Sequence, residues 1–99
     1  MLDNLFGNIQ QQQEALQQRL AEITVEASAE NGAVTVVASC DLKIENIQLN
    51  PEKLDMSDRE QIEDLVLVAV NEALEKAKQK AAIETNKLLQ SMMPPGMLG

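Results

Sequence analysis

The sequence predicts a small α+β protein in which a helix is followed by a three-stranded antiparallel meander and a long C-terminal helix. Three observations support this fold class. Apolar residues recur at helical spacing over residues 3–23, residues 25–49 alternate around an Asn-Gly pair, and residues 58–93 contain neither proline nor glycine. The chain has 99 residues, which is the length of a single domain.

The first predicted helix carries a heptad seam. Its apolar side chains are separated by alternating steps of four and three residues, provided that Gln13 fills one position of the pattern. A polar residue in such a seam often specifies the register with a partner helix. The apolar members of the seam are Leu2, Phe6, Ile9, Leu16, Leu20 and Ile23.

The central segment has the period of β-strands. Residues 25–29 alternate between apolar and polar, Asn31-Gly32 is a strong hairpin signal, and residues 33–40 are rich in β-branched side chains. In the third strand, residues 43–49, Ile44 is out of phase with Ile47, so a bulge is expected near Asn46. A sheet of three strands needs a helix or a second sheet to cover one face.

The long helix is predicted over residues 58–90, with Ser57 and Glu60 forming a capping box at its start. About 33 residues make a helix of about 50 Å. A compact chain of this size has a radius of gyration of about 13 Å, so part of the helix is expected to project as an arm. Residues 1–91 are expected to form one dimerising domain, and residues 92–99 a flexible tail rich in Pro, Gly and Met.

Two apolar stripes run along this helix, so two partners are expected. The first stripe matches the heptad seam and predicts an antiparallel pair with the first helix. The second stripe predicts contact with the sheet or with a second subunit, which makes a homodimer the expected state, although a broad core-facing surface in a monomer stays open. The first stripe is Leu67, Val70, Leu74, Ala77, Ala81 and Leu88, with Glu84 in a gap; the second is Ile62, Leu65, Val66, Ala69 and Ala73.

Charge is divided unevenly along the chain. The total is −8, but residues 1–75 carry −11 and residues 76–99 carry +3. Beyond Ala73 the second stripe continues as Lys76, Lys80 and Lys87. A basic arm on an acidic body can meet phosphates, although a lysine stripe is also typical of a solvated helix face.

The composition argues against several classes of protein. The chain has no histidine, one cysteine (Cys40) and one aromatic residue (Phe6), so a zinc site, an internal disulfide and stacking of single-stranded bases are not expected. We expect no enzyme, cofactor or small-molecule substrate. The longest apolar run has six residues, too few to span a bilayer, so we expect a cytoplasmic protein that makes no membrane contact.

The order of elements resembles the bacterial nucleoid-associated YbaB/EbfC family of DNA-binding proteins, and the resemblance covers essentially the whole chain. Matching features are the Gln-rich first helix, the glycine turn before a Val-rich strand, the end of the third strand, part of the long helix and the Pro-Gly tail. In this sequence they read Asn31-Gly32-Ala33-Val34-Thr35-Val36, Ile47-Gln48-Leu49-Asn50-Pro51, Ala69-Val70-Asn71-Glu72-Ala73 and Met93-Pro94-Pro95-Gly96-Met97.

The resemblance implies a homodimer whose helical arms extend from a central body, binding to duplex DNA in the nucleoid, and a role in gene regulation. It implies no catalytic residues. The DNA contacts would fall on Lys76, Lys78, Lys80, Lys87 and Arg19.

The alternative function is that of a small acidic dimeric chaperone or protein-interaction module that holds a client protein. Apolar residues near the end of the long helix would suit that role, because methionine adapts to varied surfaces. They are Leu88, Leu89, Met92 and Met93.

Overall fold

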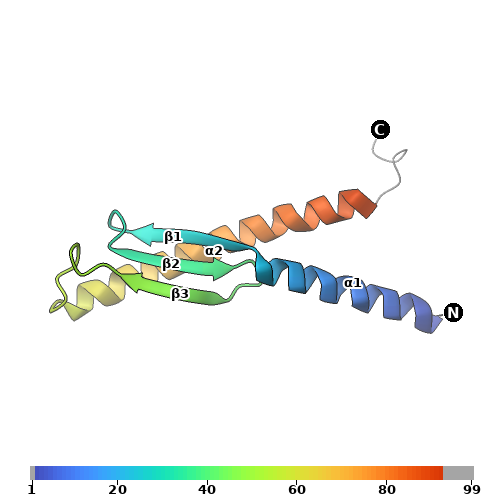
Figure 1. Cartoon of the computed structure of the whole chain (residues 1–99), viewed down its shortest axis with the longest axis horizontal. Helices are drawn as coiled ribbons and strands as arrows, with labels where there is room; N and C mark the ends of the chain where they lie inside the picture. The colour runs from blue at the N-terminus through green and yellow to red at the C-terminus, as the bar shows by residue number, and fades with distance from the viewer. Residues whose placement is uncertain (1, 93–99) are drawn as a thin grey trace.

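The computed structural model describes residues 2–92, and the side chains of residue 7 and residues 9–91. It contains α1 (Leu2–Glu22), β1 (Thr24–Ala29), β2 (Val34–Ser39), β3 (Ile44–Leu49) and α2 (Arg59–Met92) in this order (Figure 1). The predicted fold class and element order are therefore confirmed. Met92 is the last residue of α2, and the remainder of the predicted tail lies outside the described residues.

The sheet is antiparallel with β2 in the centre and β1 and β3 at its edges. Val37 pairs with Asn46 but Ala38 pairs with Ile44, so Glu45 is an extra residue in β3. This bulge confirms the expected irregularity near Asn46. It also explains why the apolar residues of this strand do not alternate regularly in the sequence. The one inserted residue places Ile44 on the same face of the sheet as Ile47.

The β1–β2 hairpin forms where the Asn-Gly pair predicted it, but its loop is longer than two residues. Residues 30–33 connect the strands, and the Ala33 amide donates to the Glu30 carbonyl at 3.1 Å. Glu30, Asn31 and Gly32 have φ values of 52°, 55° and 90°. Glycine and asparagine adopt this left-handed backbone most readily, which is why this pair marks the turn.

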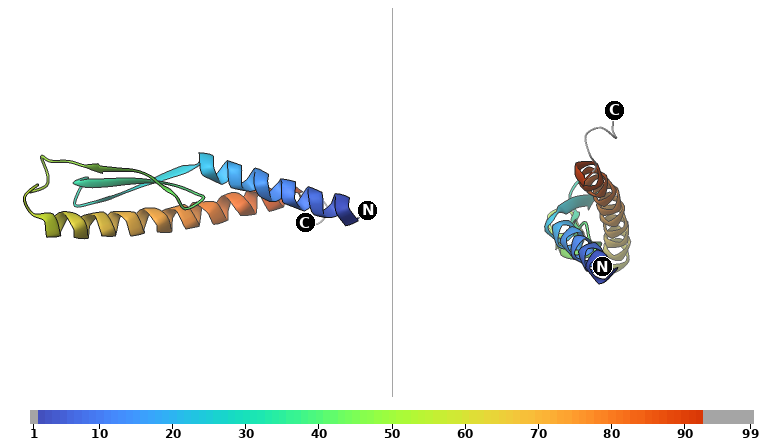
Figure 2. Two further views of the ribbon diagram at one scale, coloured as in Figure 1. Left: turned by 90° about the horizontal axis from the view of Figure 1, so that it is seen from below. Right: turned by 90° about the vertical axis from the view of Figure 1, so that its right-hand side faces the viewer.

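The core lies between one face of the sheet and α2, and Figure 2 (left) shows these as two layers. Val34 and Val36 of β2 are fully buried against Ala69 and Ala73 of α2, which are themselves 0% exposed. Alanine has almost no side chain beyond Cβ, so the helix can approach the sheet closely. Ile62, Leu65 and Val66 are half-buried at the margin of this contact, so the whole second stripe lies in the chain's own core.

The start of α2 differs from the prediction. Asp58, not Ser57, is the capping residue, since its Oδ1 accepts the Gln61 amide at 3.2 Å. The Ser57 hydroxyl instead donates to Asp55 Oδ1 at 2.6 Å, in the turn that precedes the helix. The predicted capping box is therefore wrong. The carboxylate of Asp58 caps the helix, and the Ser57 hydroxyl is not available because it is hydrogen-bonded to Asp55.

The predicted pairing of α1 with α2 along their full apolar seams is also wrong. Leu20 is buried and Leu16 half-buried, but Ile9 and Gln13 are exposed on α1, and Leu67 is exposed on α2. The side chains of Leu2 and Phe6 lie outside the described residues.

The physical reason is the anchoring of α1 to the sheet. The Cys40 amide donates to the carbonyls of Leu20 and Ile23, at 3.1 and 2.8 Å. These bonds tie the last turn of α1 to the end of β2 and fix its direction, while the alanine face of α2 is committed to β1 and β2. The two helices consequently diverge beyond the sheet (Figure 1).

The molecule is elongated, with principal extents of 63, 32 and 16 Å. Its radius of gyration is 18.9 Å, against about 13 Å for a compact chain of this length. The excess comes from the helix ends that extend beyond the sheet (Figures 1 and 2). We refer to the open angle between residues 9–20 of α1 and residues 80–91 of α2 as the fork.

Candidate nucleic-acid interface

Three cationic side chains meet on one glutamate at the base of the fork. Arg19 Nη2 of α1 lies 3.3 Å from Glu84 Oε2, and this pair joins the two helices. Within α2, Lys87 Nζ and Lys80 Nζ lie 3.5 and 3.7 Å from Glu84 Oε1. Both carboxylate oxygens are thus engaged, and the group carries a net charge of +2.

The glutamate is buried and the cations are not. The side chain of Glu84 is 7% exposed, whereas those of Lys80, Arg19 and Lys87 are 43%, 60% and 63% exposed. Burial by itself raises the pKa of Glu84, but Lys87, the hydrogen bond from Arg19 and Lys80 outweigh it, so this pKa lies below its ordinary value. The carboxylate is therefore ionised at neutral pH, and the positive charges face solvent.

The local sequence explains this arrangement. Lys80 and Lys87 lie four residues before and three residues after Glu84, the spacings that bring side chains together on a helix. Arg19 precedes Leu20, whose burial fixes the rotation of α1 at this point. Glu84 was not among the residues predicted from the sequence, because its position reads as a gap in an apolar seam. The 80–84–87 spacing is the signal that could have identified it.

Lys76 occupies a different environment. Its Nζ donates to the carbonyl of Glu26 in β1 at 3.1 Å and lies 3.8 Å from Glu72 Oε1. It therefore lies against the β1 edge of the body and not in the fork.

Lys78 is exposed and is displaced by about 200° around the helix from both Lys76 and Lys80. The structure therefore brings together Arg19, Lys80 and Lys87, and separates Lys76 and Lys78 from them.

Shallow hollows flank the cation cluster. One, of about 240 Å³, is lined by Arg19, Glu84, Lys87, Leu88 and Ser91. A neighbouring hollow of about 350 Å³ shares Arg19 and Leu88 and extends along α1 to Ala15. Both hollows lie between the helices of the fork, so the exposed cations border space that is accessible to another molecule.

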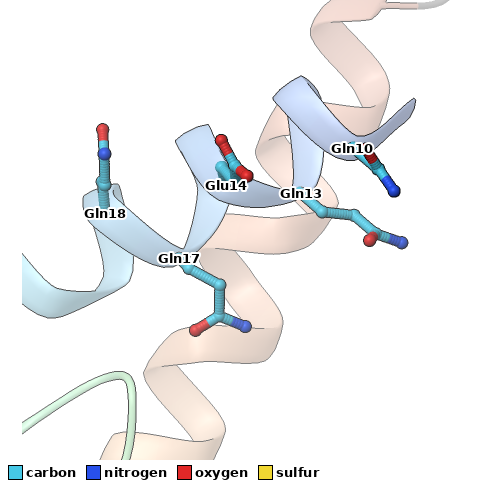
Figure 3. A pocket seen from close by; sticks show the side chains of 5 residues that line it. All are labelled: Gln10, Gln13, Glu14, Gln17 and Gln18. Carbon is cyan, nitrogen blue, oxygen red and sulfur yellow. The ribbon is translucent and has the colours of Figure 1, made fainter. Parts of the chain in front are cut away.

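The outer part of α1 presents amides in place of cations. A hollow of about 580 Å³ is lined by α1 residues alone: Gln10, Gln13, Glu14, Gln17 and Gln18. Figure 3 shows Gln10, Gln13 and Gln17 along one side of the helix, with Gln18 directed away from them. These amides can donate and accept hydrogen bonds, but they attract no anion by charge.

No group of three or more potential metal ligands occurs among residues 2–92. Cys40 is buried, and its pKa is raised mainly by that burial, with Lys80 acting in the opposite direction. The thiolate is thus disfavoured. In the same part of the chain, no helix has the length and apolar character needed to cross a membrane.

Comparison with known proteins identifies the family. The YbaB/EbfC DNA-binding family matches residues 1–92. This chain belongs to that family. A nucleoid-associated protein of Acetivibrio thermocellus is 48% identical to it over 90 residues, covering 88% of this chain and 80% of the relative. A nucleoid-associated protein of Pelotomaculum thermopropionicum is 42% identical, covering 90% of this chain and 85% of the relative.

One solved structure supports the fold independently. The crystal structure of the uncharacterized protein HP0035 from Helicobacter pylori matches this YbaB/EbfC family member with a TM-score of 0.73. The match covers 89% of this chain and 92% of HP0035 at 14% sequence identity. At that identity the similarity shows the fold alone.

Proposed function

We propose that this protein is a nucleoid-associated protein that binds duplex DNA as a homodimer, with the ends of α1 and α2 acting as arms. The observation that carries the proposal is the solvent-facing cation cluster of Arg19, Lys80 and Lys87, in a chain whose first 75 residues carry −11. Membership of a DNA-binding family and relatives named nucleoid-associated support it. Regulation of gene expression stays a prediction from the family resemblance.

Binding would rest on the phosphate backbone. Each lysine or arginine that neutralises a phosphate releases condensed counterions from the duplex, which gives affinity without sequence information. The acidic body repels DNA and directs it towards the fork. Lys78 would extend the contact over the outer side of α2, whereas Lys76 would first have to leave the Glu26 carbonyl.

The second copy is proposed to cover the β3 side of the body. Ile44, Ile47 and Leu49 share the sheet face that packs on α2, since their partners in β2 are Ala38, Val36 and Val34. They are nevertheless 37%, 44% and 38% exposed, because α2 lies across β1 and β2 and barely reaches β3. An apolar strip on an edge strand is a surface that natural proteins normally cover.

The two edges of the sheet differ in a way that favours β3 as the interface. Lys76 lies on the β1 edge, where the outward side chains Thr24, Glu26 and Ser28 are polar. The Lys76 ammonium group of α2 occupies the Glu26 carbonyl on this edge, so another strand would have to displace it before pairing there. The β3 edge has the apolar strip instead.

A salt titration of DNA binding tests the function. Fluorescence anisotropy with a labelled duplex of random sequence should show binding at micromolar dimer and about 50 mM salt. If about four to six phosphates are neutralised, the logarithm of the association constant should fall against the logarithm of salt with a slope of about −4 to −5. Absence of binding at low salt would overturn the proposal.

Paired variants test the site. Lys80→Gln with Lys87→Gln should weaken binding at least about tenfold and make the slope shallower by about 3 to 4, because a dimer loses four cations. The control is Lys53→Gln with Arg59→Gln, which removes the same charge from the β3–α2 connection and the first residue of α2. Figure 1 shows the start of α2 at the opposite end of the molecule from the fork. Equal losses in the two pairs would show that net charge, not the fork, governs binding.

The client-binding alternative is favoured by one observation, the exposure of Ile83 and Leu89 on the part of α2 that borders the fork. Affinity capture from lysate, with and without nuclease, separates the two functions. Protein partners that survive nuclease treatment would support the alternative, and recovery of DNA lost on nuclease treatment would support DNA binding.

A further inference from the structure

We infer that Glu84 is a built-in competitor of DNA phosphate that weakens binding at the fork. The inference rests on the proposed function, since it concerns regulation of the same cation cluster. It assigns to a buried residue an effect on DNA affinity opposite to that of the cations around it.

The geometry supports this role because a carboxylate and a phosphate offer the same kind of acceptor. Arg19 Nη2 faces Oε2 at 3.3 Å, and the two lysine ammonium groups face Oε1 at 3.5 and 3.7 Å. In the free protein all three cations therefore already have an anion beside them. A DNA phosphate that approaches must share these cations with Glu84.

Burial decides which anion has the outer position. Glu84 is 7% exposed, so it lies beneath the cations, while the three cations are at least 43% exposed. A phosphate can reach the cations from solvent without displacing the glutamate. It then meets a cluster of net charge +2 instead of +3, with a negative charge a few ångströms behind the cations.

The main rival interpretation is that Glu84 holds the cations in position for DNA. The ion pair between Arg19 and Glu84 joins residues 65 positions apart, so a positioning effect is physically reasonable. The two interpretations predict opposite changes in DNA affinity when the charge of Glu84 is removed. If Glu84 competes with phosphate, removing its charge strengthens DNA binding; if it positions the cations, removing its charge weakens binding.

The decisive comparison is Glu84→Gln against Glu75→Gln. Both substitutions remove one negative charge from α2 and keep the side-chain shape, but Glu75 is exposed and lies outside the cation cluster. We expect Glu84→Gln to bind duplex DNA about threefold more tightly per fork than Glu75→Gln, hence about tenfold for a dimer. The salt slope should steepen by about 1 per fork, because one more phosphate charge is neutralised.

A double-mutant cycle with Arg19→Gln adds a readout that a structural role would not move. If Glu84 masks Arg19, then Arg19→Gln should weaken DNA binding more in the Glu84→Gln background than in the wild type. Equal losses in both backgrounds, or weaker binding by Glu84→Gln than by Glu75→Gln, would overturn the inference. Thermal melts establish that each variant is folded.

A measurement on the wild-type protein covers the case in which Glu84→Gln does not fold. Carboxyl NMR of Glu84 in the free and DNA-bound protein should show a higher pKa in the complex, because phosphates share its cations and add negative charge nearby. An unchanged pKa would overturn the inference.

The outcomes separate this inference from the proposed function. If the wild type binds DNA and Glu84→Gln matches Glu75→Gln, the competitor role fails and DNA binding stands. If neither the wild type nor any variant binds at low salt, both proposals fail. Binding by Glu84→Gln alone would support both.

Discussion

At the scale of single residues, Glu84 shows how a side chain's neighbours decide its role. In sequence it interrupts an apolar stripe, and in the structure it is the group on which both helices of the fork converge. The contacts of Glu84 with Lys80 and Lys87 were predictable, since both lysines lie at helical spacing from it. The contact with Arg19 was not, because it crosses 65 residues and depends on how α1 leaves the sheet.

The environment of Glu84 predicts a dependence of stability on pH. Its pKa in the folded protein lies below the ordinary value of 4.5, so the ionised carboxylate stabilises the fold at neutral pH. That contribution is present above the unfolded pKa and is lost as pH falls through the folded pKa. Urea unfolding of the wild type and Glu84→Gln should therefore differ most near neutral pH and converge below about pH 4.

At the scale of elements, α2 carries two kinds of surface along one face, one apolar and one basic. Its first half presents Ala69 and Ala73 to the sheet, and the same sector continues as Lys80 and Lys87 beyond the sheet. The sequence predicted both stripes of this helix and the point at which apolar residues give way to lysine. It left open whether the second stripe meets the sheet or a second subunit, because periodicity gives the angle between stripes and says nothing about the partner of each.

The close contact of α2 with the sheet makes its alanines sensitive to volume. Ala73→Leu adds three carbon atoms where the side chain is 0% exposed, so it should destabilise the protein by about 1–3 kcal/mol or more. Ala82→Leu makes the same change at an exposed position of the helix and should alter stability by less than about 0.5 kcal/mol. Chemical denaturation of the two variants measures the difference, and equal effects would contradict the packing described for α2.

At the scale of the whole molecule, the proposed DNA-binding surface and the proposed dimer interface lie in different places. The cation cluster lies in the fork, and the apolar strip of Ile44, Ile47 and Leu49 lies on the β3 side of the body. A second copy on the strip therefore leaves the cations of each chain free. This separation allows dimer formation and DNA binding to be tested independently.

The proposed interface predicts the oligomeric state of two variants. Ile47→Lys places a charge in the strip and should convert a dimer to a monomer in size-exclusion chromatography with light scattering. Gln48→Lys introduces the same charge on the opposite face of β3 and should leave the dimer intact. A dimer of unchanged stability in Ile47→Lys would exclude the β3 strip as the interface. Loss of the dimer by Gln48→Lys alone would place the interface on the other face of the sheet.

The sequence by itself determined the elements of this protein, their order, the hairpin, the bulge near Asn46 and the division of charge at residue 75. These features depend on local backbone preferences, on periodicity and on composition. The tertiary structure decided that Asp58 caps α2, that the second stripe meets the sheet, that α1 diverges from α2, and that Arg19 joins Lys80 and Lys87 on Glu84. The physical reason is that each depends on the angle at which distant segments meet. That angle is set by a few contacts, such as those between Cys40 and the end of α1, which no local pattern encodes.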